Sequence, residues 1–77
     1  MKVQVRAFAN LRDFVPYGNG EFELTLAEGA TVADLIAALR IPAAVEAVVL
    51  VNGRRADRPT ALAAGDAVTL FPPMEGG

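Results

Sequence analysis

TVADLIAALR (residues 31–40) is the stretch that decides the fold, because it predicts the one convincing helix of a 77-residue chain. Thr31 is a favourable N-cap, and Asp34 stands where a capping box requires an acid. Pro42 disfavours a helical conformation in the residue before it, so we expect the helix to end by Ile41. Apolar residues recur at i, i+3, i+4 and i+7 and form one stripe for burial against a sheet: Val32, Leu35, Ile36 and Leu39.

Working outward from the helix, strands are predicted on both sides. Residues 2–9 (KVQVRAFA) and 21–26 (EFELTL) alternate polar and apolar residues, which indicates two half-buried strands that form a hairpin across a loop. Residues 47–51 (AVVLV) are an apolar β-branched run, and the Asn-Gly pair at 52–53 is a strong hairpin signal leading into a short strand from residue 54. Residues 67–71 (AVTLF) are predicted to form the last strand. The pattern predicts a two-layer α+β domain with four to five strands and one main helix.

Composition excludes several classes of function. The chain has no cysteine and no histidine, so we expect no Cys/His metal site and no Ser-His or Cys-His nucleophile pair. A net charge of -2 gives no electrostatic reason to expect nucleic acid. No apolar run approaches the roughly 20 residues that span a bilayer, and the alternating start is unlike a signal peptide. We therefore expect a soluble cytoplasmic protein with no membrane partner.

The chain closes with FPPMEGG (residues 71–77). Pro72 and Pro73 cannot donate to a strand ladder and favour a stiff, extended exit. We expect a domain over residues 1–73 and a flexible tail over residues 74–77, which are Met74, Glu75, Gly76 and Gly77. Four residues reach at most about 13–14 Å. Glycines give the slimmest backbone, suited to entering another protein's pocket, whereas the alternative is an idle, frayed end.

The order of these elements and the final Gly-Gly resemble the MoaD/ThiS family of ubiquitin-like, β-grasp sulfur carriers. The likeness runs from VRAFANLRD through EGATVADLIAAL, VVLVNGR and AGDAVTLFPP to the GG end. FPP before the tail is more similar to the molybdopterin-type carriers than to the thiamin-type ones. Two departures bear on the partner: the family commonly has Val and a small residue where Met74 and Glu75 stand, and often an apolar residue where Arg55 stands.

The resemblance implies a protein co-substrate that is not itself an enzyme and holds no bound cofactor. An E1-like activating enzyme would use ATP to adenylate the Gly77 carboxylate, and sulfur would then replace the adenylate to give a thiocarboxylate. The large catalytic subunit of the synthase would pass this sulfur to a molybdopterin precursor. Alternatives remain: a thiamin-type carrier or one with another acceptor such as tRNA, a ubiquitin-like modifier conjugated to lysines, or an inert interaction module.

The resemblance also implies that the first and last strands lie side by side. Phe8 and Phe71 both fall at the outward phase of their strands, so they are predicted to form an aromatic patch that docks the partner near Pro72 and Pro73. Arg55 is expected to rim this patch. The alternatives are that loop residues such as Phe14 or Tyr17 cover the rings, and that the arginines at 54, 55 and 58 are merely solvated.

Overall fold

A computed structural model describes residues 1–16 and 20–73. In these ranges the chain forms five strands, one α-helix and one 3₁₀ helix. In chain order they are β1 (Lys2–Ala7), η1 (Ala9–Phe14), β2 (Glu21–Thr25), α1 (Val32–Ala38), β3 (Val48–Val51), β4 (Arg54–Arg55) and β5 (Ala67–Phe71).

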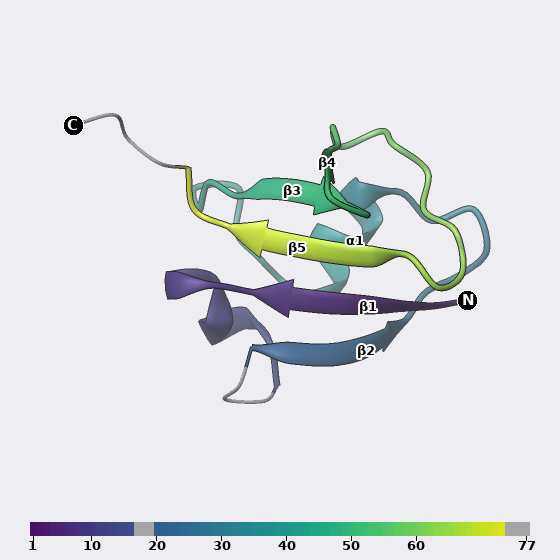
Figure 1. Cartoon of the computed structure of the whole chain (residues 1–77). Helices are drawn as coiled ribbons and strands as arrows, with labels where there is room; N and C mark the ends of the chain where they lie inside the picture. The colour runs from purple at the N-terminus through teal and green to yellow at the C-terminus, as the bar shows by residue number, and fades with distance from the viewer. Residues whose placement is uncertain (17–19, 74–77) are drawn as a thin grey trace.

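The strands form one mixed sheet in the order β2-β1-β5-β3-β4. The first and last strands pair in parallel at its centre, with Gln4 opposite Ala67 and Ala7 opposite Leu70, while the other pairs are antiparallel. Figure 1 shows the arrows of β1 and β5 pointing the same way, with α1 behind the sheet. This is the β-grasp arrangement, so the predicted fold class and the β1–β2 hairpin are confirmed.

The core lies between α1 and the face of the sheet that it covers. The alternation of β1 holds in full, because Val3, Val5 and Ala7 are buried while the residues between them are exposed. The helix contributes the predicted stripe, and Leu35 at its centre is fully buried. Each such side chain contributes about 1.5–3 kcal/mol by leaving water. The buried cluster is completed by Leu11, Val15, Ile41, Val49, Leu62, Val68 and Leu70.

The capping box predicted at the start of α1 is present. The Asp34 amide donates to Thr31 Oγ1 at 3.3 Å, and the Thr31 amide donates to Asp34 Oδ2 at 2.8 Å. The end of the helix comes earlier than Pro42 requires. Arg40 has a φ of +58°, and the Ile41 amide donates to the Ile36 carbonyl at 3.2 Å, which is the Schellman arrangement. The backbone conformation at Arg40, not the proline, therefore ends the helix.

Two connections also differ from the prediction. The segment after β1 was expected to be a plain loop, but it contains η1, whose Leu11 is completely buried. The sequence before β5 is also compatible with one helical turn at residues 60–64, but this described segment forms none, and Ala61 instead bridges to Thr31. The Asn-Gly turn was predicted correctly: Asn52 and Gly53 have φ values of +53° and +84°, as a tight hairpin requires. The part of the chain that the structure describes has no helix long and apolar enough to cross a membrane.

Candidate functional site

The parallel pairing of β1 with β5 brings the two aromatic residues of the predicted docking patch to the same end of the sheet. The Phe8 amide donates to the Leu70 carbonyl at 3.0 Å, so Phe8 continues the register alongside Phe71. The Phe8 side chain is 42% exposed and is the large hydrophobic residue that the described structure leaves most open. Phe71 is half-buried. A substantial part of Phe8 therefore stays open to solvent, and Tyr17 lies outside the described residues.

Strand β3 extends this surface across the face of the sheet that α1 does not cover. Val48 lies opposite Phe71, and Leu50 lies opposite Thr69, and both side chains are half-buried. We call Phe8, Phe71, Val48 and Leu50 the apolar strip. Val48 and Leu50 were not predicted as site residues; they have the opposite phase to the buried Val49, and the pairing of β3 with β5 places them beside Phe71. Contiguous apolar surface beside polar residues marks an interaction site.

The other half of the same face is polar, and its side chains pair with one another. Arg6 Nε donates to Glu21 Oε1 at 2.7 Å, and Gln4 Nε2 donates to Glu23 Oε2 at 2.9 Å. Lys2 Nζ lies 3.5 Å from Glu23 Oε1. We call these five residues the paired ladder. Its charges already have partners, so a docking protein gains little by contacting them.

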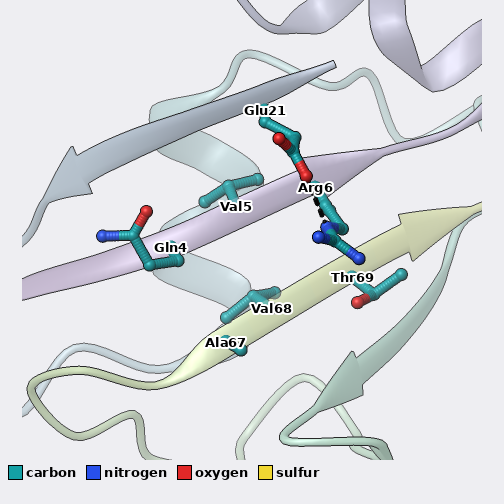
Figure 2. A pocket seen from close by; sticks show the side chains of 7 residues that line it. All are labelled: Gln4, Val5, Arg6, Glu21, Ala67, Val68 and Thr69. Carbon is teal, nitrogen blue, oxygen red and sulfur yellow. Dashed lines mark hydrogen bonds and ion pairs between the residues drawn. The ribbon is translucent and has the colours of Figure 1, made fainter. Parts of the chain in front are cut away.

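A hollow of about 460 Å³ lies over β1 and β5 (Figure 2). Figure 2 shows Gln4 and Arg6 extending from β1, Thr69 on β5, and Arg6 joined to Glu21. The ionisable groups in its lining are this single paired Arg–Glu couple. No acid–base pair is therefore available there for catalysis on a small molecule.

Arg55 lies on β4, opposite Leu50, and its side chain is exposed. It therefore stands beside Leu50, at the β4 end of the apolar strip. Strand β5 ends at Phe71, and the two prolines follow, with Pro72 half-buried and Pro73 exposed. The predicted tail residues Met74, Glu75, Gly76 and Gly77 lie outside the described residues, as does any structural test of the 1–73 and 74–77 division.

Gly20 supports the end of β1. Its carbonyl accepts the Ala7 amide at 2.7 Å, and its φ is +76°. A Cβ on this residue would lie 2.5 Å from the Ala7 carbonyl oxygen, far inside contact distance. Glycine is thus required here by close approach as well as by backbone conformation. It holds the backbone immediately before Phe8.

The described residues offer a surface for docking and no internal chemical site. No polar or charged side chain is buried among residues 1–16 and 20–73. The same ranges contain no group of three acidic residues placed to hold a metal ion. The feature of these residues that suits recognition by another protein is the apolar strip, with the exposed Phe8 at its end.

Comparison with known proteins agrees with this geometry. The model of the ThiS family matches residues 5–77. The chain belongs to the ThiS family. As a ThiS-family member it is structurally similar to the small archaeal modifier protein SAMP1 of Haloferax volcanii, with 30% identity, full coverage of both chains and a TM-score of 0.76. A comparison with curated protein sequences finds no match.

Two further solved structures resemble this ThiS-family chain. Molybdopterin converting factor subunit 1 of Pyrococcus furiosus is 32% identical, with 95% of this chain and 98% of that chain covered and a TM-score of 0.78. A protein–protein complex of subunits 1 and 2 of the molybdopterin-converting factor of Helicobacter pylori contains a chain that is 25% identical over the full length of both, with a TM-score of 0.65. The predicted MoaD/ThiS resemblance is confirmed, and the chain has the fold of the ubiquitin-like sulfur carriers.

Proposed function

We propose that this chain carries sulfur as a thiocarboxylate on Gly77 and delivers it in molybdopterin biosynthesis. The observation that carries the proposal is that the ThiS-family match continues through the final Gly-Gly at residues 76 and 77. The similarity to molybdopterin converting factor subunit 1 supports the choice of pathway. The chain then acts as a co-substrate and not as an enzyme, and it holds no cofactor of its own.

The proposed chemistry takes place in partner proteins. An E1-like activating enzyme joins the Gly77 carboxylate to the AMP part of ATP, with release of pyrophosphate. A sulfur nucleophile then attacks the acyl carbon, and AMP leaves. Activation is needed because a carboxylate is ionised at neutral pH and is a poor electrophile. Since ATP is consumed, we place the reaction in the cytoplasm.

The apolar strip is the proposed contact with both partners. Phe8 and Phe71 lie at the end of the sheet from which the chain continues through Pro72 and Pro73 towards residues 74–77. A protein that covers the strip is therefore placed beside the root of the tail, and Arg55 rims that contact. The Helicobacter pylori complex of subunits 1 and 2 supports a large synthase subunit as one partner.

Intact-mass measurement tests the proposal directly. Protein isolated from its native cell, or treated with the activating enzyme, ATP and a sulfur donor, is expected to gain the mass difference between sulfur and oxygen. A variant that lacks Gly77 is the control, and it is expected to fold normally and to gain nothing. If the truncated chain acquires sulfur as efficiently as the intact one, the assignment of Gly77 is wrong.

A second candidate function is conjugation to other proteins, which the similarity to SAMP1, a modifier protein, favours. Both functions begin with adenylation of the same carboxylate, so they diverge only at the nucleophile. Immunoblots of cell extract would show higher-mass conjugates, and peptide mass spectrometry would find Gly-Gly joined to lysine. A chain that accumulates thiocarboxylate without such conjugates is a carrier alone.

A further inference from the structure

A second hollow lies at the β4 side of the sheet and shares Val48 and Arg55 with the apolar strip and its rim. Its volume is about 150 Å³. Helix α1 and strand β3 supply apolar walls, and the segment after β4 supplies charged side chains. The lining residues are Val32, Ile36, Ala47, Val48, Val49, Arg55, Ala56, Asp57 and Arg58.

The two arginines of this hollow differ from the cations of the paired ladder. Arg55 and Arg58 are exposed, and neither forms an ion pair with any residue in the part of the chain that the structure describes. Asp57 lines the same hollow and leaves it with one net positive charge. An external carboxylate can therefore pair with a guanidinium here without displacing an existing ion pair.

The backbone amides at the start of α1 are already hydrogen-bonded within the protein and do not bind such an anion. The Val32 amide donates to the Thr60 carbonyl and the Ala33 amide donates to the Arg58 carbonyl, both at 2.9 Å. These two amides are therefore not available to an anion in the hollow, whereas the guanidinium groups of Arg55 and Arg58 are. The carboxylate of Asp57 and the apolar walls favour a singly charged carboxylate attached to a protein over a free phosphate, which carries more charge.

The hollow is continuous with the apolar strip. Val48 lies opposite Phe71 on the strip and also lines the hollow. Arg55 stands opposite Leu50 and lines the hollow as well. A protein that covers the strip therefore meets the hollow at the β4 edge of the sheet, where α1 supplies its far wall, whereas the paired ladder lies on β1 and β2.

The geometry points to an acidic side chain of the docked partner seated in this hollow and bound by Arg55 and Arg58. The inference rests on the proposed function for the choice of a protein partner, and it adds the chemistry by which that partner is recognised. Contact then extends from Phe8 across the strip to Arg58. Partners with an Asp or Glu at this place are selected over otherwise similar apolar surfaces.

Charge reversal at two nearby arginines tests the inference with a matched control. Arg58→Glu changes a residue that lines the hollow, whereas Arg54→Glu changes a residue of β4, opposite Val51, that does not line it. Both residues are exposed, and both variants change the net charge by the same amount. Binding to the large synthase subunit of the same organism is measured by calorimetry at low and high salt.

We expect Arg58→Glu to weaken binding about tenfold, because attraction becomes repulsion of like charges. Arg54→Glu is expected to weaken it less than about threefold, through screened long-range charge alone. Arg58→Lys should retain most of the affinity, and high salt should narrow the gap between the two reversals. Equal losses in both reversals would overturn the inference.

A peptide titration separates this inference from the proposed function. Amide shifts are followed by NMR on adding a blocked peptide of alternating Glu and Leu, its Gln and Leu counterpart, or inorganic phosphate. Shifts at residues 32, 36, 47–49 and 55–58 with the Glu peptide alone, lost in Arg58→Glu, support the inference even if the large subunit does not bind. Shifts with phosphate alone, or with none of the probes, refute it.

Discussion

Replacing Phe8 with alanine removes the most exposed part of the apolar strip, and the structure sets the size of the effect. A phenylalanine offers about 150–250 Å² of surface, and 42% of Phe8 remains exposed, which leaves about 80 Å² for a partner to cover. At about 25 cal/mol per Å² this contributes about 2 kcal/mol to docking. Phe8→Ala is therefore expected to weaken binding of the activating enzyme about 30-fold.

The assay is calorimetric or surface-based binding of the folded variant to the activating enzyme, with thiocarboxylate formation followed by intact mass. Phe22→Ala is the matched control, because Phe22 lies on the helix side of β2 and packs against the core. It loses the same atoms and some stability, but no docking surface. Phe8→Leu retains most of the apolar area and should lose only a few-fold in affinity. If Phe8→Ala binds as tightly as the parent chain, or Phe22→Ala weakens binding as much, the docking argument fails.

Three further predictions concern stability and are measured by urea unfolding. Gly20→Ala is expected to cost roughly 2 kcal/mol more than Gly29→Ala, because both glycines have positive φ but only at Gly20 does a Cβ meet backbone; equal costs would contradict the close approach to Ala7. Leu35→Ala should cost about 2–5 kcal/mol, because its fully buried side chain leaves a cavity; a loss below about 1 kcal/mol would mean that the helix does not anchor the core. Thr31→Ala should cost about 1 kcal/mol through loss of the capping box, and an unchanged midpoint would show that the cap contributes nothing.

Much of the fold could be predicted because its signals are local. The capping box at Thr31 and Asp34 involves residues three apart, and the turn at Asn52 and Gly53 depends on two adjacent conformations. Strand phase in β1 is set by alternation within six residues. Each of these local structures is determined by residues close in sequence. Tertiary contacts therefore did not change the conformation that the sequence predicts.

Other features of the fold could not be predicted, because no strong local sequence signal marks them. The 3₁₀ helix η1 is held by tertiary packing of Leu11, which no periodic pattern announces in so short a segment. Arg40 ends α1 in a left-handed conformation that usually calls for glycine, so Pro42 was the stronger visible signal. Residues 60–62 are held by hydrogen bonds and a β-bridge to residues 30–32, about thirty residues earlier in the chain.

The residues of the candidate site also fall into two groups: those that local sequence signals could predict, and those that depend on strand pairing. Phe8 and Phe71 could be named because an outward aromatic breaks the alternation of its own strand, and Arg55 because it departs from an apolar family position. Val48 and Leu50 belong to the strip only because β3 pairs with β5, and that pairing is invisible in a single apolar run. Gly20 depends on the carbonyl of Ala7, which the hairpin brings against it.

Under the proposed function, the parallel pairing of β1 with β5 couples recognition by a partner to chemistry at the tail. An antiparallel last strand would end beside Lys2, whereas the observed register ends β5 beside Phe8. Docking on the strip thus fixes the point from which residues 74–77 start, and four residues reach at most about 13–14 Å. A partner that binds the strip must hold its nucleotide or precursor within that distance of Pro73. The direction of β5 therefore sets the spacing between the partner's docking surface and its active centre.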